Sequence, residues 1–487
     1  MRCKEPNLDP RNWNETRRLG HQMLEDMFDY LGSVTERPAW QPIPDSVVQG
    51  FQQPVPRKGT DPARVYDEFK TNIMPYPTGN LHPRFFGWAV GNGTVTGMLA
   101  EMLASGMNPI LSGFNQSATH IEKEVLRWLS ILLGFPEEAS GVLVSGGTMA
   151  NLNGLAVARQ MKAGFDVRRT GLHGQPPLRV YGSVETHSWI YKACELMGMG
   201  SEGFRAVPVD QNMRIDLNAC KAMICEDLAS GFRPICVIGT AGTTNTGSID
   251  DLAGLRALAD EFDLWFHVDG ALGSLAALSE RYKELVRGQE LADSLALDLH
   301  KWGYLQYEVG CVLVRDPEAH KATFALAPAY LTSSQRGVSV NTTYYADRGL
   351  QLSRSFRALK VWMSFKEQGV DLLGQVIEKN INQIFYLTEL IKQNTRLELL
   401  APVSLNVACF RYNPGRISEE SLNRLNEEII ICLQERGIAV PSLTRVKGKS
   451  AIRVCIVNHR TRQIDLDVLA EAICRIGEEL NHTRRCA

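Results

Sequence analysis

The stretch Trp265-Phe-His-Val-Asp-Gly-Ala271 is an apolar run that ends in a carboxylate, the pattern of a buried strand in a parallel sheet. A second run, Leu297-Asp-Leu-His-Lys-Trp302, follows it and carries Lys301. A carboxylate at one strand end and a lysine near a later one form the pair that pyridoxal phosphate chemistry requires. The lysine amine forms a Schiff base with that cofactor, and the carboxylate keeps its pyridine nitrogen protonated. A single lysine is usually an exposed surface residue, so this hypothesis holds only if the sequence also contains the other parts of a cofactor site.

A phosphate site is predicted around Gly146 and Gly147. Gly141-Val-Leu-Val-Ser145 is typical of a short strand, the two glycines break it, and helical periodicity follows over 149–159. A helix capped by Thr148 would turn free backbone N–H groups and its positive end toward a phosphate. An ordinary N-capped helix after a tight turn is the alternative interpretation of the same pattern.

Two further residues extend this candidate site. His187 lies where a strand pattern gives way to a helix pattern, so its imidazole would be able to stack on a pyridine ring and hydrogen-bond a substrate carboxylate. A buried histidine with purely structural partners is the alternative for this residue. Thr240 ends the apolar run that begins at Pro234, and its hydroxyl is suited to contact the ring oxygen or the phosphate.

These features occur in one order along the chain. The motifs are Asn80-Leu-His-Pro-Arg-Phe-Phe86, Ser145-Gly-Gly-Thr-Met-Ala-Asn151, His187-Ser188, Gly239-Thr-Ala-Gly-Thr-Thr-Asn-Thr-Gly-Ser-Ile-Asp250, His267-Val-Asp-Gly-Ala271 and His300-Lys-Trp302. With them the chain resembles, from about Asn12 to Gly477, the pyridoxal-phosphate-dependent group II amino-acid decarboxylases, which include the aromatic-L-amino-acid, tyrosine, tryptophan and glutamate decarboxylases. The resemblance implies an α/β fold of fold type I, aspartate-aminotransferase-like, with a seven-stranded sheet, and a homodimer with active sites at its interface.

Carried over residue by residue, the resemblance makes Lys301 the Schiff-base lysine and Asp269 the partner of the pyridinium. It places His187 on one face of the ring and the Ala271 methyl on the other. The positions that match the surroundings of the phosphate are Gly147, Thr148, Asp298 and His300. Asp298 departs from the neutral residue often found there, and a carboxylate beside a phosphate is unfavourable unless it is protonated or turned away.

The chain divides into three parts. Residues 1–77 are expected to form an arm that packs on a second subunit, with an amphipathic helix over Asn12–Val34 and an extended, proline-rich segment over Arg37–Pro77. Residues 78–369 alternate strands with helices, which predicts a large, mainly parallel sheet. Its strand runs are 142–144, 180–181, 235–238, 265–268, 295–297 and 312–314. Residues 370–487 are expected to form a smaller α+β domain with strands near 407–411 and 452–457.

The composition is typical of a soluble enzyme. With 487 residues, 44% of them hydrophobic, the chain can bury a large core, and its net charge of -2 gives no basic field for nucleic acid. No apolar run approaches the ~18 residues of a membrane span, and the N-terminus does not have the pattern of a signal peptide. Eleven cysteines without metal-like spacing indicate reduced thiols in the cytoplasm and predict no metal site.

The bond that breaks in such a site is the one held perpendicular to the ring. Decarboxylation therefore needs a pocket that holds the substrate carboxylate out of the ring plane and an acid that protonates Cα afterwards. In the family, a tyrosine on a loop that closes over the partner's site is this acid, and Tyr330 within 327–337 matches it; a simple loop anchor is the alternative. Arg453 matches an arginine that helps to hold the substrate, or it pairs with a local carboxylate.

The substrate pocket is predicted from the family alignment. The residues that would line it are His82, Phe86, Trp88 and Tyr307, which favours an aromatic side chain. Residues 89–93 depart from the Phe-Pro-type continuation of animal and plant enzymes, so aspartate, glutamate or an unusual amino acid remains open. The predicted reaction is decarboxylation of an L-amino acid to its amine, a step of carboxylic acid metabolism.

Two other activities are alternatives to amine formation. An aldehyde synthase decarboxylates and then oxidatively deaminates with dioxygen, and some relatives are non-catalytic scaffolds. In the family, tyrosine on the mobile loop and histidine over the ring accompany amine formation, whereas phenylalanine or asparagine at those respective positions accompanies aldehyde. Tyr330 and His187 therefore favour the amine.

Overall fold

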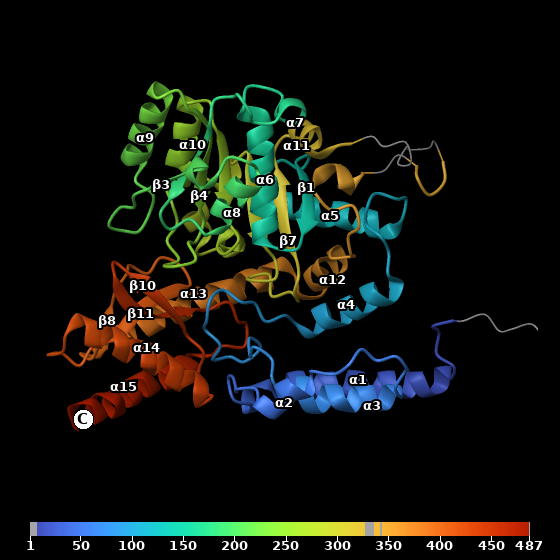
Figure 1. The fold of residues 1–487 in the computed structure, drawn as a ribbon, viewed down its shortest axis with the longest axis vertical. Coiled ribbons are helices and arrows are strands. Elements are labelled where there is room, and N and C mark those ends of the chain that lie inside the picture. Colours follow the sequence, from blue (N-terminus) through green and yellow to red (C-terminus); the bar gives the residue numbers. More distant parts are fainter. Residues whose placement is uncertain (1–6, 327–335, 341–342, 487) are drawn as a thin grey trace, which may run out of the picture.

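The computed structural model describes residues 7–326, 336–340 and 343–486, and two sheets organise it (Figure 1). The strands of the large sheet are β1 (Ser140–Val144), β2 (Leu178–Ser183), β3 (Phe204–Val207), β4 (Arg233–Thr240), β5 (Trp265–Asp269), β6 (Ser294–Asp298) and β7 (Gly310–Val314). The strands of the small sheet are β8 (Leu397–Leu399), β9 (Val407–Tyr412), β10 (Ser442–Val446) and β11 (Lys449–Cys455).

Helices surround both sheets and fill the space between them. Before β4 they are α1 (Trp13–Gly32), α2 (Asp45–Gly50), α3 (Pro62–Glu68), α4 (Val95–Met107), α5 (Ser117–Leu132), α6 (Gly147–Lys162), α7 (Val167–Thr170), α8 (Trp189–Leu196) and α9 (Leu217–Ala229). The later ones are α10 (Leu252–Glu261), α11 (Pro317–Phe324), α12 (Ala358–Gln368), α13 (Val370–Gln393), α14 (Glu419–Glu435) and α15 (Gln463–Cys486). No helix in the described ranges is both long enough and apolar enough to cross a bilayer.

The large sheet is mainly parallel, as the sequence predicts. Its order is β1-β7-β6-β5-β4-β2-β3, and only β7 runs against its neighbours β6 and β1. All six predicted strand runs lie in it. The seventh strand, β3, was not found from the sequence because its four residues lie at the edge of the sheet and only its two end residues are buried.

The direction of the strands decides where functional side chains can gather. Strands β4, β5 and β6 pair in parallel, so Thr240, Asp269 and Asp298 all lie at the same edge of the sheet. Strand β1 runs in the same direction as β6, because both are antiparallel to β7. Ser145, which follows β1, therefore lies at this edge as well. Ligands of open α/β sheets bind beyond the carboxyl ends of the strands.

Helix α6 packs across the middle of the sheet and is tied to it by His267. The ring atom Nε2 of His267 lies 2.8 Å from Asn151 Oδ1, and Nδ1 lies 2.8 Å from Ser294 Oγ. A Cβ at Gly154 would come within 2.6 Å of this ring, so only glycine allows the close approach. The start of α6 is therefore fixed over β5 and β6 by a hydrogen-bonded, fully buried imidazole.

The N-terminal arm is more helical than the sequence predicts. Helix α1 confirms the amphipathic helix, and the Asn12 side chain caps it by accepting from the N–H groups of Asn14 and Glu15. The extended conformation expected over 37–77 is wrong in part, because α2 and α3 form within it. Asp61 caps α3 and Pro62 occupies its first turn, where a missing N–H is tolerated. Prolines here begin a helix rather than prevent one.

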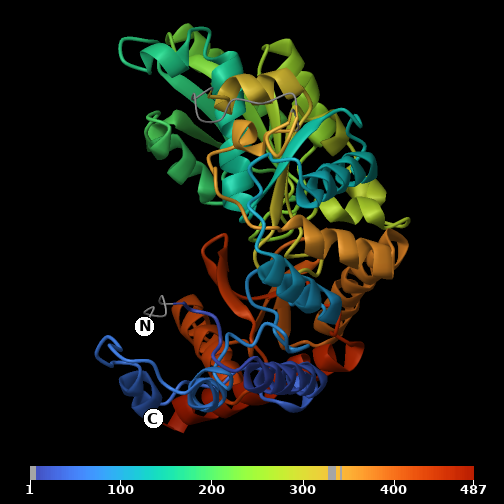
Figure 2. The same ribbon diagram turned by 90° about the vertical axis from the view of Figure 1, so that its right-hand side faces the viewer.

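The small domain includes residues that precede the large sheet. Its antiparallel sheet has the order β10-β11-β9-β8, and the long helix α13 packs against β8 and β9 (Figure 2). The Phe86 N–H donates to Val440 O at 2.9 Å, and the Cys455 N–H donates to Phe86 O at 2.9 Å. The Phe86 ring is fully buried in the core of this domain. The segment around Phe86 is thus packed as part of the small domain.

A buried ion pair is expected to dominate the stability of β1. Arg354 pairs with Glu122, both side chains are about 1% exposed or less, and both bond the backbone of Leu143. Replacing Arg354 with leucine leaves the Glu122 carboxylate buried without a cation, which should cost about 3–5 kcal/mol of unfolding free energy. Urea unfolding of the purified protein measures this loss.

A surface pair provides the control for this variant. Arg127 pairs with Glu124 at 2.7 Å, but its side chain is 42% exposed. Arg127→Leu should therefore change the unfolding free energy far less than Arg354→Leu does. Equal losses in the two variants would show that burial of the Glu122–Arg354 pair has no special weight.

Candidate active site

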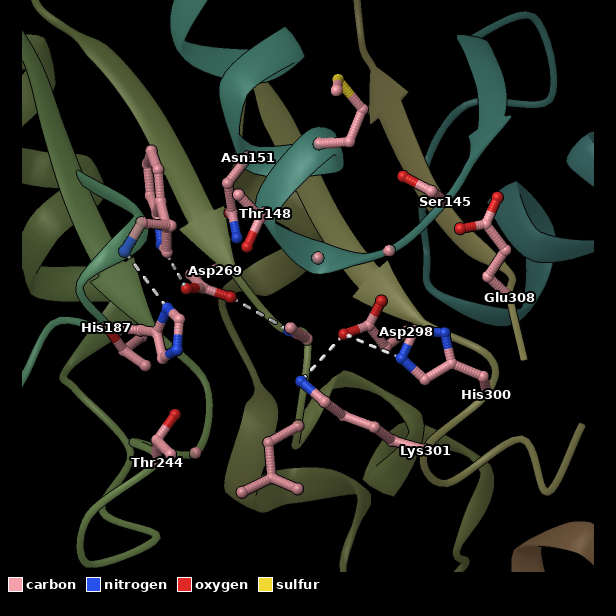
Figure 3. Close-up of a pocket in the computed structure, with 18 residues that line it drawn as sticks. Ser145, Thr148, Asn151, His187, Thr244, Asp269, Asp298, His300, Lys301 and Glu308 are labelled. Carbon is pink, nitrogen blue, oxygen red and sulfur yellow. Dashed lines mark hydrogen bonds and ion pairs between the residues drawn. The ribbon is translucent and has the colours of Figure 1, made fainter. Parts of the chain in front are cut away.

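A cavity of about 370 Å³ opens at the carboxyl edge of the large sheet (Figure 3). All the residues that the sequence predicts around a cofactor line it, although they come from distant segments. They are Gly147, Thr148, His187, Thr240, Asp269, Ala271, Asp298, His300 and Lys301. The fold thus brings the predicted set together in one place.

Lys301 reaches into this cavity and pairs with Asp298. Its Nζ lies 2.8 Å from Asp298 Oδ2, one turn earlier in the chain (Figure 3). Burial acts to lower the pKa of Lys301, but the charge and hydrogen bond of Asp298 outweigh burial and the pKa lies above its ordinary value. The amine is therefore held as a cation at neutral pH in this arrangement.

His300 completes the surroundings of the Asp298 carboxylate. Its Nδ1 accepts from the Val309 N–H at 3.3 Å, so the proton of the neutral ring is on Nε2, which faces Asp298 Oδ2 at 3.7 Å. Burial lowers the pKa of His300 and favours this neutral ring. The Tyr307 ring lies 4.5 Å from the His300 ring, and the Tyr307 hydroxyl accepts from the Gly91 N–H.

Asp269 is held by two neutral donors at the other end of the cavity. Its Oδ2 accepts from Trp189 Nε1 at 2.7 Å, and its Oδ1 accepts from the Ala271 N–H at 3.2 Å. Only 5% of the residue is exposed. Sequence reasoning did not assign Trp189 a role. Its sequence signal is a tryptophan two residues after His187, because a buried indole N–H requires an acceptor.

His187 lies between β2 and α8, as predicted, and its ring orientation is fixed by the helix. Its Nδ1 accepts from the Trp189 N–H at 3.2 Å, so the neutral ring carries its proton on Nε2. Burial lowers the pKa of His187, and the Asp269 carboxylate opposes that shift. Figure 3 shows the ring on the same side of the cavity as Thr244. At neutral pH this imidazole is a donor through Nε2.

The glycine turn differs from its prediction in one respect. Gly146, not Thr148, is the N-cap of α6, and no side chain caps the helix. Gly146 is the last residue in an extended conformation, so Thr148 falls inside the first turn. A Cβ at Gly147 would lie 2.8 Å from Asp298 Oδ2 and 2.9 Å from the Ala271 Cβ. The free N–H groups of this turn thus border the cavity without a side chain over them.

A second cavity of about 310 Å³ adjoins the first and shares His187 and Thr244 with it. Trp88 and Arg453 line it. Arg453 donates to Trp88 O at 2.6 Å and to Asn245 O at 3.1 Å, so it holds backbone carbonyls where a local carboxylate was the alternative partner. Trp88 is left-handed, with φ of 52°, a conformation unusual for a bulky residue and supported here by these bonds.

The remaining predicted substrate residues lie outside both cavities. His82 lines a separate cavity with Tyr30 and Trp40. Phe86 belongs to the core of the small domain, and Tyr307 stands beside His300 with half of its surface exposed. The structure separates His82 and Phe86 from the site because the backbone between them turns toward Val440. Tyr330 lies outside the described residues.

The cavity suits pyridoxal phosphate. Thr240 Oγ1 and Asp298 Oδ1 are buried and have no hydrogen-bond partner within the described ranges. A lysine, a carboxylate held by neutral donors and an uncovered helix N-terminus surround one space. Fold and site together define an α/β enzyme of the pyridoxal-phosphate-dependent class.

Comparison with known proteins narrows this class. A family model described as the pyridoxal-dependent decarboxylase conserved domain matches residues 44–413, and the chain belongs to this family. It is 34% identical to an aromatic-L-amino-acid decarboxylase of Bacillus atrophaeus, over 97% of each chain, and 28% identical to a phenylacetaldehyde synthase of Arabidopsis thaliana, over 92% of this chain and 93% of the other. The crystal structure of Oryza sativa TDC with PLP and tryptamine has the same fold, with a TM-score of 0.90, 24% identity and coverage of 97% of this chain and 100% of that one.

The environment of His187 predicts how its ring titrates. In the cofactor-free protein we expect the pKa of His187 to lie below that of an exposed histidine, because burial disfavours the imidazolium. Asp269→Asn should lower it further, since this change removes a negative charge that favours the imidazolium. NMR titration of the protein with labelled histidine measures both values, with His187→Asn to assign the signal. Glu308→Gln is the control, because the Glu308 carboxylate is already paired with Arg357 at 2.6 Å. A pKa of His187 above that of exposed histidine would contradict the burial argument.

Proposed function

We propose that the protein decarboxylates an aromatic L-amino acid to its amine and carbon dioxide. The observation that carries the proposal is the placement of Lys301 and Asp269 in one cavity beside the uncovered first turn of α6. Membership of the pyridoxal-dependent decarboxylase family supports the reaction. The similarity to an aromatic-L-amino-acid decarboxylase, and the Trp88 ring in the adjoining cavity, support an aromatic side chain.

The cofactor supplies the electron sink. Pyridoxal phosphate, when bound, takes up the electron pair left on the substrate Cα as the bond to the carboxylate breaks. Lys301 supplies the amine that holds the cofactor aldehyde between turnovers. Asp269 keeps the ring nitrogen protonated, and the Trp189 N–H and the Ala271 N–H hold that carboxylate in place. A charge-assisted hydrogen bond of this kind contributes about 1.5–3 kcal/mol.

The other cavity residues position the cofactor and the substrate. The N–H groups of Gly147 and Thr148 would hold the phosphate, with His300 Nε2 as a further donor. Ala271 and His187 would hold the ring between them. Because the neutral His187 ring carries its proton on Nε2, it donates to the substrate carboxylate. The Thr240 hydroxyl is available for the ring oxygen or the phosphate.

Trp88 and Arg453 shape the space for the substrate beyond His187. Arg453 holds the Trp88 and Asn245 carbonyls, and its Nη2, which is buried and has no hydrogen-bond partner within the described residues, is available to a substrate carboxylate in the second cavity. The Trp88 ring is 54% exposed and offers an aromatic surface to a flat side chain. The Trp88 ring therefore supports an aromatic substrate side chain.

A homodimer accounts for apolar side chains that remain exposed on α1 and α4. Trp13, Phe28, Met102 and Met107 are 61%, 39%, 51% and 59% exposed, and a partner subunit would bury apolar side chains of this kind. The family resemblance supports a partner subunit that packs on the N-terminal arm. The nine described cysteines are free thiols, which supports a cytoplasmic location.

Incubation with each proteinogenic amino acid tests the reaction and the lysine together. The protein supplied with pyridoxal phosphate should release amine and carbon dioxide from aromatic amino acids, and Lys301→Ala should release neither. Mass spectrometry reads both products and, after borohydride reduction, finds the modified peptide. Lys192→Ala is the control, because Lys192 lies close enough to affect the pKa of His187 but is not proposed to bind the cofactor. A pyridoxyl group on a peptide without Lys301, or turnover of acidic amino acids alone, would contradict the proposal.

An aldehyde synthase is the second candidate, favoured by the similarity to the Arabidopsis thaliana phenylacetaldehyde synthase. The two activities differ in what happens to Cα after carbon dioxide has left. A well-placed acid protonates Cα and gives the amine, whereas slow protonation lets dioxygen react and gives aldehyde, ammonia and peroxide. We propose Tyr330 of the partner subunit as the acid, which makes the amine the main product.

Tyr330→Phe separates these two outcomes. Loss of a positioned acid should lower amine formation by roughly 10²–10⁴-fold, while cofactor binding and carbon dioxide release change little and peroxide appears in air. Amine, carbon dioxide and peroxide are measured in the same reaction. An unchanged amine yield would make Tyr330 a loop anchor, and peroxide from the unmodified protein at the rate of carbon dioxide release would make the protein the aldehyde synthase.

A further inference from the structure

The Asp298 carboxylate lies directly beneath the glycine turn that begins α6. A Cβ placed on Gly147 would be 2.8 Å from Asp298 Oδ2, and one on Gly146 would be 3.5 Å from Asp298 Oδ1. The side chain is 3% exposed. Figure 3 shows it between Lys301 and the turn, with interactions drawn to Lys301 and His300. The Asp298 carboxylate thus lies next to the free backbone N–H groups at the start of α6.

The groups around this carboxylate are those that bind a phosphate. Lys301 Nζ lies 2.8 Å from Oδ2, and His300 Nε2, which carries the proton of the neutral ring, lies 3.7 Å away. The positive end of α6 adds a third favourable contribution. A phosphate that enters the same space meets these donors together with a fixed negative charge.

No other carboxylate in the described part of the cavity stands in this position. Asp269 is held at the far end by the Trp189 and Ala271 N–H groups. Glu308 lines the rim and is paired with Arg357. The first turn of α6 and the facing Gly310 contribute no ionisable side chain. The repulsion that a phosphate meets near the glycine turn therefore comes from Asp298.

We propose that the Asp298 carboxylate holds Lys301 in the cofactor-free protein and that its negative charge weakens the binding of the cofactor phosphate. This inference rests on the proposed function, because it takes pyridoxal phosphate as the ligand of the cavity. Asp298 acts here as a positioning residue and as a determinant of cofactor affinity.

The electrostatic size of the effect is large enough to measure. Two unit charges about 5 Å apart in a site of effective dielectric constant near 20 repel strongly enough to change a binding constant by more than tenfold. Lys301 offsets part of this repulsion while it remains paired with Asp298. We therefore expect removal of the Asp298 charge to tighten phosphate binding by about tenfold.

The test uses ligands that cannot react with Lys301. The full-length protein is freed of cofactor and titrated calorimetrically with 4′-deoxypyridoxine 5′-phosphate, which lacks the aldehyde, and with inorganic phosphate. Asp298→Asn and Asp298→Ala should each bind both ligands about tenfold more tightly than the unmodified protein does. Agreement between the two variants attributes the gain to the lost charge, because alanine adds no hydrogen-bond donor.

Two controls isolate the phosphate and the position. Pyridoxine, which has no phosphate, should bind the Asp298 variants and the unmodified protein with equal affinity. Glu308→Gln removes a negative charge from the rim of the same cavity and should leave the affinity for phosphate unchanged, because the Glu308 side chain is 52% exposed and solvent screens its charge, whereas the Asp298 side chain is 3% exposed. Circular dichroism and thermal melting establish that each variant is folded, and Asp298→Ser replaces any variant that is not.

The outcomes separate this inference from the proposed function. Unchanged or weaker phosphate binding in the Asp298 variants overturns the role of Asp298, even if the unmodified protein forms its adduct at Lys301 and decarboxylates. Tighter binding of pyridoxine as well as of the phosphate compounds also overturns it, because the effect would then not depend on the phosphate. Failure of the unmodified protein to form the Lys301 adduct instead overturns the proposed function.

Discussion

Parallel pairing of β4, β5 and β6 is the constraint on which the site depends. The register sets Thr240 opposite Asp269 and Asp269 opposite Ala296, so three strands end in one row. Lys301 follows this row by a single turn, and β1 brings the glycine turn to it from an earlier part of the chain. Side chains that are far apart in sequence meet because the strands share a direction.

The two carboxylates in this row have different partners. Asp269 accepts hydrogen bonds from an indole and a backbone N–H, which are neutral, so its charge is left to act on a ligand. Asp298 is paired with the cation of Lys301, so its charge holds the lysine and also adds a negative charge beneath the glycine turn. Two aspartates at neighbouring strand ends therefore have different roles: Asp269 faces the ligand at one end of the cavity, and Asp298 pairs with Lys301 at the other.

The sequence predicted those parts of the molecule that local patterns encode. Apolar runs that end in Thr240, Asp269 and Asp298 give both the strands and the functional edge, since strand direction follows from alternation with helices. The cap of α6 was misplaced because Gly146 is extended and leaves Thr148 inside the helix, a difference of backbone angles that the residue types do not express. Tyr330 stays a prediction from the family pattern.

Other features depend on contacts between distant segments and have no local pattern. Phe86 was expected at the substrate, but its backbone pairs with Val440 and Cys455 and carries it into the core of the small domain. The Trp189 indole N–H finds its acceptor only through the fold. Helix α3 of the N-terminal arm is capped by Asp61 and begins at Pro62, so a proline that suggests an extended chain starts a helix instead.

Arg453 links the two domains through backbone carbonyls, and under the proposed function this limits which positions around the second cavity can change substrate preference. Its hydrogen bonds to Trp88 O and Asn245 O fix the backbone in the wall of the second cavity. A substitution of Arg453 would therefore change the main-chain conformation there as well as one side chain. Val184 and Leu443 line the same cavity, are 55% and 47% exposed, and their side chains form no such hydrogen bonds. Selection for activity on a different amino-acid substrate should therefore favour substitutions at these two positions, where side-chain volume and polarity can change without disturbing the backbone held by Arg453.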